Sequence, residues 1–392
     1  MREETRNAER GTRNTDPTTD LPWARRLQLV RRNWEHRGRD ALLAAVKFFL
    51  ARSSARDHEV SSLSSAESRL AIRRVLIIRT GKAIGDAVLS LVLAPECRRL
   101  FPTARLDLLL RDNVSALFRE GAGVDALLEL HPRFLLWPLA TCRLLASLRG
   151  GRYDLVVACD NPHKSSFTTL CLALWTGSPL RVGFENEESG AFLSLTVPRV
   201  HSAPVVSSLL RLLSPFGGVP ARAVPHLIAS PSLAEAAGAI LGDGACPIVI
   251  FAPDHWRKSW SLEFFVRMAR EMTERKHRVF LAFGPGDRRG EDSSVREWIE
   301  KSDGLGRVLP SCSLPMLAAV LSRCRLFMSN DCGPYHVAVA AGASCVAAFL
   351  SPETLNDFGY QKEGSLVAVH DADPERLWHM ARDEALRLLC LR

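Results

Sequence analysis

Asp86 is the first residue in this chain whose type and position suit group-transfer chemistry. It follows the segment VLIIRTGKAIG, in which a buried strand is expected to end at Arg79 and a loop containing Gly81 and Gly85 leads into a helix. A carboxylate at that place can cap the helix or accept a proton from an attacking hydroxyl. The local sequence favours capping, and the role of general base stays open beside it.

Lys258 is the second candidate, in the segment FAPDHWRKSWSLEFF, which again comes directly after an expected buried strand. A lysine held there can neutralise a departing diphosphate while negative charge grows on it. A solvated loop lysine is the more common situation. Lys258 taken alone therefore decides nothing.

Asp287 follows a predicted turn made by Gly284 and Gly286 in the segment FGPGDRRGED. Acids in this position after a strand often accept hydrogen bonds from ribose hydroxyls. A simple turn explains the two glycines equally well. The segment is thus a candidate nucleotide contact with a structural alternative.

The strongest candidate is the segment LFMSNDCGPYHVAVAAG, which predicts a strand, a short turn and a helix that begins at Pro334. Free backbone N–H groups and the helix dipole make such a helix start an anion site, and Gly333 would let a phosphate approach the backbone. Asp331 and His336 could hold a nucleotide, or they could cap and pack. Histidine alone is more often structural.

These side chains require strands that end at one edge of a sheet. From Ala71 onward, short apolar runs alternate with helical stretches, as in βαβ units with a parallel sheet. A Pro/Gly/Ser-containing stretch at residues 214–232 divides the chain into two such series. The predicted strands are Val75–Arg79, Leu106–Leu110, Ala126–Leu130, Leu155–Ala158, Leu180–Phe184, Ile248–Ala252, Arg278–Phe283, Arg307–Leu309, Leu326–Asn330 and Cys345–Leu350.

Two doubly wound α/β domains in series would place their ligand crevices at the carboxyl ends of the strands, facing each other across a cleft. The length of 392 residues also favours two domains, and 47% hydrophobic with 24% charged residues is typical of a globular protein. The stretch Pro374–Leu391 predicts an amphipathic helix that could pack back across the domain boundary.

The net charge of +8 is concentrated near the N-terminus. Residues 21–56 contain nine Arg or Lys against Glu35 and Asp40, so the remainder of the chain sums to +1 and does not resemble a nucleic-acid-binding surface. Residues 21–56 could lie peripherally on an anionic membrane or pack as a helical hairpin. Their longest apolar run, of about eleven residues, is too short to cross a bilayer.

The N-terminus and the cysteines bear on the compartment. Residues 1–20 are polar and lack a secretory signal, which predicts a cytoplasmic protein. With residues 21–56 on a membrane, it could lie on the inner face of that membrane. Residues 53–70 are Ser-rich and are expected to form a linker. The ten cysteines show neither a C-x-x-C pair nor a zinc-like spacing. We therefore expect reduced cysteines and no metal site.

Four motifs in this order resemble glycosyltransferase family 9, the ADP-heptose:lipopolysaccharide heptosyltransferase family. They are Gly-Asp at 85–86, Tyr-Asp-Leu-Val-Val at 153–157, Lys-x-Trp at 258–260 and Asn-Asp-x-Gly-Pro-x-His at 330–336. The likeness spans about residues 73–370. It implies a GT-B fold with two Rossmann-like domains and a basic helical extension at the N-terminus.

The resemblance also implies boundaries and roles. Residues 1–70 would be the extension and linker, 71–232 the acceptor domain, 233–372 the nucleotide-sugar domain and 373–392 a terminal helix. The implied reaction moves a heptose from ADP-heptose onto a lipopolysaccharide core or related glycan, with inversion and without a metal or other cofactor. Asp86 would be the base and Lys258 a diphosphate contact. The donor pocket would contain Gly85, Lys258, Asp287, Asp331, Cys332, Gly333 and His336, and acceptor contacts would come from Lys164 and Ser165.

Several positions depart from the family pattern. The loop from Arg79 to Gly85 is one residue longer than usual, Cys332 replaces a Ser or Thr, Asp287 replaces a Glu, and Asn161-Pro162 replaces Gln-Gly. A thiol is a weaker hydrogen-bond donor than a hydroxyl. Cys332 and the longer loop at Gly81 leave open a non-catalytic nucleotide-sugar or glycan-binding subunit of the same fold. A nucleotide-sugar epimerase, an enzyme with two similar α/β domains, is the second alternative.

Overall fold

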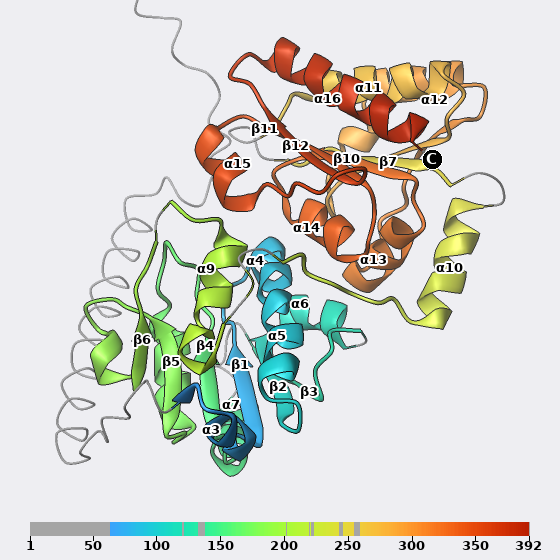
Figure 1. Ribbon diagram of the computed structural model, residues 1–392. Helices are drawn as coiled ribbons and strands as arrows, with labels where there is room; N and C mark the ends of the chain where they lie inside the picture. Colours follow the sequence, from blue (N-terminus) through green and yellow to red (C-terminus); the bar gives the residue numbers. More distant parts are fainter. Residues whose placement is uncertain are drawn as a thin grey trace, which may run out of the picture. The chain divides into compact units, whose positions relative to one another are not determined.

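The computed structural model describes residues 63–391, apart from 120, 132–137, 201, 219, 221–222, 243–245 and 255–258. All described residues belong to one compact unit (Figure 1). The predicted membrane-binding segment 21–56 and Lys258 lie outside the described residues. The boundaries predicted for separate domains stay predictions, and the two halves are called the N-lobe and the C-lobe below.

The N-lobe contains a six-stranded parallel sheet in the order β3-β2-β1-β4-β5-β6. Its strands are β1 (Arg74–Ile78), β2 (Arg105–Arg111), β3 (Ala126–Leu130), β4 (Leu155–Ala158), β5 (Leu180–Phe184) and β6 (Leu195–Val197). Its helices are α3 (Ala66–Ala71), α4 (Ile84–Leu89), α5 (Leu93–Leu100), α6 (Asp112–Ser115), α7 (Pro138–Gly150), α8 (Phe167–Trp175) and α9 (Val205–Arg211), with short 3-10 turns η1 (Ser90–Val92), η2 (Ala116–Phe118), η4 (Ser189–Ala191) and η5 (Ser214–Phe216).

The C-lobe repeats the same topology in the order β12-β11-β10-β7-β8-β9, again all parallel. Its strands are β7 (Ile248–Phe251), β8 (Val279–Ala282), β9 (Gly306–Val308), β10 (Leu326–Asn330), β11 (Cys345–Phe349) and β12 (Leu366–His370). Its helices are α10 (Pro231–Leu241), α11 (Leu262–Glu274), α12 (Ser293–Lys301), α13 (Leu314–Ser322), α14 (Gly333–Ala340), α15 (Pro352–Phe358) and α16 (Pro374–Cys390), with the 3-10 turn η6 (Arg289–Glu291).

The prediction of two doubly wound α/β halves is confirmed. All ten predicted strands occur within one or two residues of their expected bounds. Central strands such as β4 and β7 are short, fully buried apolar runs of the kind found in parallel sheets, whereas the edge strands β3 and β9 are only partly buried. The sequence analysis missed β6 and β12, which are two of the four edge strands. β6 has only three residues, LTV, and gives no continuous apolar run, whereas β12 contains the apolar run LVAV and was recognisable from it.

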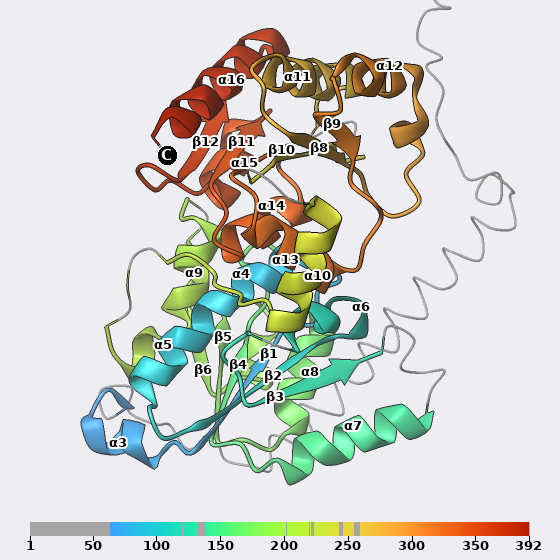
Figure 2. The same cartoon turned by 90° about the vertical axis from the view of Figure 1, so that its right-hand side faces the viewer.

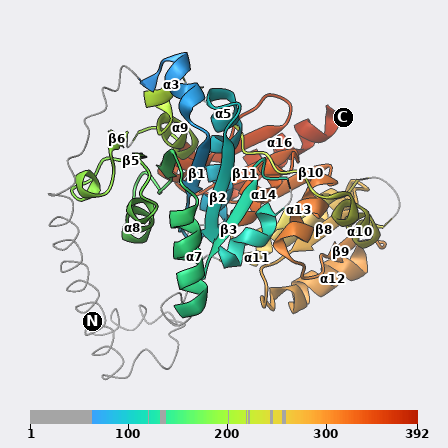
Figure 3. The same cartoon turned by 90° about the horizontal axis from the view of Figure 1, so that it is seen from below.

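Helices cover both faces of each sheet. In the N-lobe, α5 and α9 lie on one face and α7 and α8 on the other (Figures 2 and 3). In the C-lobe, α11, α12 and α16 share one apolar cluster with the sheet, while α13 and α14 belong to a second cluster on the other face. α16 packs on β10, β11 and β12 of its own lobe, so the idea that it crosses the boundary is wrong.

The second cluster continues into the N-lobe. It joins Leu93 and Val157 of the N-lobe with Tyr335 and Phe349 of the C-lobe. Residues 223–230, called the crossover segment below, lead from the N-lobe to α10, and a hydrogen bond of 2.8 Å from Leu227 N–H to the Ala340 carbonyl ties this segment to the end of α14. Because apolar packing is continuous between the lobes, the described residues form one unit rather than two.

Among the described residues, no helix is long and apolar enough to span a membrane. The same residues contain no cluster of three His, Cys, Asp or Glu side chains that could hold a metal ion. All ten cysteines are free, and Cys97, Cys159, Cys324 and Cys345 are buried.

Candidate active site

Each sheet has a topological switch point, where successive strands depart in opposite directions. In the N-lobe it lies between β1 and β4, and in the C-lobe between β7 and β10. Loops at the carboxyl ends of such strand pairs form the ligand crevices of open α/β sheets. Asp86, Lys164 and Asp331 follow β1, β4 and β10, so these three predicted site residues lie at the two switch points, whereas Asp287 follows β8.

Asp86 is the third residue of α4, and it does not cap the helix. The N-cap is Ala83, which makes no side-chain capping bond. The Asp86 carboxylate instead forms an ion pair of 2.7 Å with Arg79 Nη2, and its other oxygen accepts a 3.4 Å hydrogen bond from Asn161 Nδ2. The capping interpretation is therefore wrong, and the carboxylate is held between the loops after β1 and β4.

Arg79 is almost fully buried beneath this carboxylate. Its Nη1 donates to the Cys159 carbonyl at 2.9 Å, and its Nε, also buried, has no hydrogen-bond partner among the described residues. Gly81 passes close above the guanidinium, since a Cβ at position 81 would lie 3.3 Å from Nε. The Asp86 side chain, which is 23% exposed, is thus paired with a buried cation.

Two helix starts, one from each lobe, pack against each other beside Asp86. A Cβ at Gly85 of α4 would lie 2.6 Å from His336 Cδ2 of α14, and a Cβ at Gly333 would lie 3.1 Å from Ile84 Cβ. Gly333 therefore leaves room for Ile84 of the other lobe, a contact that the sequence analysis did not foresee. The pair of glycines brings Asp86 to the start of α14.

Asn330 at the end of β10 anchors the loop that follows β7. Its side-chain oxygen accepts the Trp260 backbone N–H at 2.9 Å, and its amide donates to the Ala348 carbonyl at 2.7 Å. Asn330 is fully buried, so these bonds are shielded from water. The network fixes the chain two residues after Lys258. Sequence reasoning assigned Asn330 no role, although its place within the Asn-Asp-x-Gly motif was a signal.

Cys332 and His336 lie at the start of α14 and have different surroundings. Cys332 is the N-cap and makes no side-chain capping bond, while burial raises the pKa of its thiol to about 12. His336 is buried, and its Nδ1 lies 3.2 Å from the Tyr360 hydroxyl. The thiol is neutral, and the imidazole is part of the packed junction between the lobes. Asp331 lies between β10 and α14 at the same junction.

Asp287 follows β8 but is occupied by a neighbour. Arg289 donates to both of its oxygens, and Arg289 Nη2 also donates to the Ala252 carbonyl at 3.0 Å. Burial alone would raise the pKa of Asp287, but the hydrogen bonds and charge of Arg289 outweigh it and hold that pKa below its usual range. The role of Asp287 as a ribose contact stays a prediction. In that role, its carboxylate would have to accept hydrogen bonds from the ribose hydroxyls and from Arg289 at the same time.

Lys164 and Ser165 lie in the loop after β4. Lys164 is exposed, whereas Ser165 Oγ accepts hydrogen bonds from Asn186 Nδ2 at 3.0 Å and from Arg199. The loop is fixed by Asp160, which accepts from Ser166 N–H and Thr169 Oγ1 at 2.8 Å each. Arg199 thus adds a second cation beside Lys164, which sequence reasoning missed.

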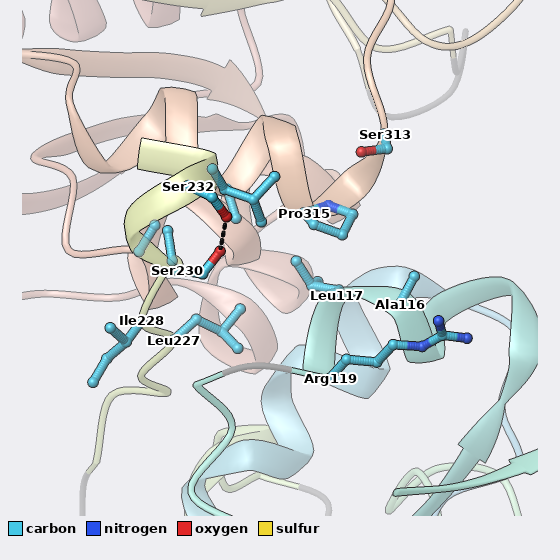
Figure 4. A pocket seen from close by; sticks show the side chains of 13 residues that line it. Ala116, Leu117, Arg119, Leu227, Ile228, Ser230, Ser232, Ser313 and Pro315 are labelled. Carbon is cyan, nitrogen blue, oxygen red and sulfur yellow. Dashed lines mark hydrogen bonds between the residues drawn. The ribbon is translucent and has the colours of Figure 1, made fainter. Parts of the chain in front are cut away.

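A cavity of about 360 Å³ lies away from this site. It lies between η2, the crossover segment and the starts of α10 and α13, and it reaches α14 at Ala341, the opposite end of that helix from Gly333 (Figure 4). Its lining is mostly aliphatic and Ser side chains with Arg119 at one side (Figure 4). None of the predicted site residues lines it.

The family model for glycosyltransferase family 9 (heptosyltransferase) matches residues 141–363, which is more than half of the chain. The chain belongs to glycosyltransferase family 9. The matched range contains Lys164, Ser165, Lys258 and the residues around α14, whereas Asp86 precedes it. A search of the curated proteins gives no match.

Solved structures of this family have the same fold. A family 9 glycosyltransferase from Veillonella parvula has 17% sequence identity and a TM-score of 0.66, and covers 81% of this chain and 95% of its own. The ADP-heptose lipopolysaccharide heptosyltransferase II of E. coli gives 19%, 0.61, 81% and 98% for the same quantities. E. coli heptosyltransferase WaaC with ADP gives 17%, 0.62, 81% and 98%. The predicted GT-B fold is confirmed for the described lobes.

Proposed function

We propose that this family 9 glycosyltransferase transfers a heptose from ADP-heptose to a lipopolysaccharide core or a related glycan, with inversion at the anomeric carbon and without a required metal ion. The observation that carries the proposal is the position of the Asp86 carboxylate at the start of α14, where the two switch points of the fold meet. Family membership and the solved WaaC complex with ADP support an adenine nucleotide as leaving group.

In the proposed reaction, Asp86 accepts the proton of an acceptor hydroxyl while that oxygen attacks the anomeric carbon. The new carbon–oxygen bond forms on the face opposite the bond to the diphosphate, which breaks. The pair of electrons in that bond leaves with ADP. The Arg79 and Asn161 contacts hold the carboxylate in a fixed orientation, which lowers the cost of reaching the reactive geometry.

The donor diphosphate is proposed to bind at the start of α14 and at Lys258. Backbone N–H groups in the first turn of a helix attract anions, and the Cys332 side chain does not cap them. Asn330 fixes the backbone at Trp260, two residues after Lys258 in the sequence. The acceptor is proposed to bind near Ser165 and the cations Lys164 and Arg199, whose positive charges suit acidic or phosphorylated groups.

The proposal is tested with purified protein, a panel of ADP-, GDP- and UDP-sugars and deacylated core glycans, with products identified by mass spectrometry. We expect transfer from ADP-heptose in the presence of a chelator. Asp86→Asn should lower the rate by about 10² to 10⁴-fold, the usual range for a lost general base, while ADP affinity stays near the wild-type value. An active Asp86→Asn enzyme would remove this residue from the role of base.

The two alternative functions give different results in the same assay. Tight nucleotide-sugar binding without transfer to any acceptor would favour a non-catalytic binding subunit. Conversion of the donor sugar without any acceptor would identify an epimerase. Transfer from a GDP- or UDP-sugar would keep the glycosyltransferase and replace the proposed donor.

A further inference from the structure

One face of the N-lobe comes from two segments without a single acidic residue. Residues 130–153 and 161–184 contain no Asp or Glu but six Arg or Lys. α7 lies within the first segment and α8 within the second, and both cover the same side of the sheet (Figure 3). The Trp175 indole N–H of α8 donates to the Leu145 carbonyl of α7 at 2.8 Å, which joins the two helices.

Four acids border these segments, and three of them are engaged in local interactions. Asp154 accepts the backbone N–H groups of Arg73 and Arg74, and Asp160 is buried between Ser166 and Thr169. Glu129 forms an ion pair with Arg119 at 2.9 Å. The fourth, Glu185, follows the second segment and is exposed, so the acidic side chains lie at the border of the face and not within the two segments.

The face exposes both cations and large apolar side chains. Leu139 is 76% exposed and Trp175 is 50% exposed. The exposed cations are Arg143, Arg149, Arg152 and Lys164. Arg181 is turned inward, where it donates to the Phe192 and Ser178 carbonyls. We call the surface formed by Leu139, Trp175 and these four exposed cations the α7–α8 face.

We infer that the α7–α8 face is a docking surface for an anionic lipid bilayer. Exposed Trp and Leu side chains insert at the boundary between headgroups and acyl chains, and Arg and Lys pair with anionic headgroups. Acidic residues would be repelled by the same headgroups, which fits their absence over both segments. Attachment of this kind is peripheral and needs no helix that spans the bilayer.

The location of the face connects docking with the acceptor. α8 begins at Phe167, directly after the loop that carries Lys164 and Ser165, so the start of α8 adjoins the proposed acceptor site. A bilayer on the α7–α8 face would present the headgroup region of a glycolipid near this loop. In this respect the inference rests on the proposed function, because it takes the acceptor to be anchored in the membrane.

The test measures co-sedimentation of the full-length protein with vesicles of phosphatidylcholine alone or with phosphatidylglycerol added. The variant Arg143→Glu/Arg152→Glu reverses two exposed charges on the face and leaves Arg149, which lies against Gly177, in place. The matched control Arg270→Glu/Arg296→Glu makes the same change in net charge on α11 and α12 of the C-lobe. Melting temperatures establish that both variants fold.

We expect the wild type and the control to bind anionic vesicles, with binding that weakens at high salt, and the face variant to bind at least about tenfold more weakly. Leu139→Ser should also weaken binding, because it removes the most exposed apolar side chain of the face. Equal binding by the face variant and the control would overturn the inference. If the wild type does not bind anionic vesicles, the inference is also overturned, and an acidic macromolecule is favoured as the partner of this face.

Two controls separate this inference from the others. A variant with reversed charges within residues 21–56 tests the N-terminal segment. If that variant loses vesicle binding while the face variant still binds like the wild type, docking belongs to the N-terminal segment alone. Transfer to a deacylated, water-soluble acceptor should be unchanged in the face variant. If vesicle binding depends on the face but no sugar is ever transferred, the proposed function fails while the docking surface stands.

Discussion

Asp86 illustrates how one buried cation can define a reactive group. The carboxylate pairs with Arg79, and Arg79 is fixed in turn by the Cys159 carbonyl and by Gly81. A buried arginine is rigid and always charged, so it holds a carboxylate in one orientation. The general base proposed here is thus positioned by the chain on both sides of the β1/β4 switch point.

Arg79→Met is expected to reduce the turnover rate by roughly 10²-fold, a typical cost of misplacing a catalytic group, while KM for the donor changes little. Arg79→Lys should restore part of the rate because it keeps a cation near Asp86. The measurement is steady-state kinetics with a melting curve for each variant. If Arg79 acts through Asp86, adding Arg79→Met to Asp86→Asn lowers the rate no further; an additive loss would contradict this.

Asp160 gives a prediction for pH. Burial raises its pKa to about 6 from an ordinary 3.8, against the hydrogen bonds of Ser166 and Thr169 and the charge of Arg79. The folded protein therefore binds this proton more tightly than the unfolded chain, and its contribution to stability is full below pH 4 and is lost as pH rises through 6.

Between pH 4 and pH 7, the free energy of unfolding of the wild type should fall relative to Asp160→Asn by up to about 3 kcal/mol. Urea titrations of both proteins across that range measure the difference. A difference that is constant with pH would show that Asp160 is ionised throughout.

At the scale of elements, the contact between α4 and α14 determines the separation of the starts of these two helices. Gly85→Ala would place a methyl group 2.6 Å from the buried His336 ring, so the helices must move apart. We expect a loss of about 1–3 kcal/mol in stability, as for other overpacked cores, together with a lower transfer rate. Gly190→Ala is the matched control, since nothing lies within 4 Å of its Cβ position. Equal stability of the two variants would contradict this prediction.

Strands were the most predictable elements. A strand such as β4, LVVA, is buried at every residue, and such runs are recognisable without any partner. β12 contains the run LVAV and was recognisable in the same way, whereas β6, LTV, is too short to give such a run.

The candidate site was predictable only in part. Residues that directly follow parallel strands were expected at the carboxyl edge of each sheet, and Asp86 and Asp331 do lie there. The Arg79–Asp86 pair was missed because it depends on the path of the loop between β1 and α4, and the Gly333 contact was missed because Ile84 lies far away in sequence. The Asp287–Arg289 pair was not predicted either, although its two residues are close in sequence.

At the scale of the whole molecule, the shared core predicts that both lobes unfold together. Cys97 and Cys159 of the N-lobe and Cys324 and Cys345 of the C-lobe are all buried in the same apolar cluster. On heating, a thiol reagent should therefore label these four cysteines over one temperature range, as measured by peptide mass spectrometry. Labelling of the N-lobe pair well before the C-lobe pair would show that the lobes unfold separately.

The hydrogen bond from Leu227 to Ala340 adds a constraint on motion during turnover. It attaches the segment at Leu227 to the end of α14 that is farthest from Gly333, while the packing of Gly85 against His336 holds the opposite end of the helix against α4. A rotation of one lobe about Ala340 would therefore have to separate α4 from α14, and it would widen the gap between Asp86 and Gly333. Such a rotation is resisted at both ends of the helix.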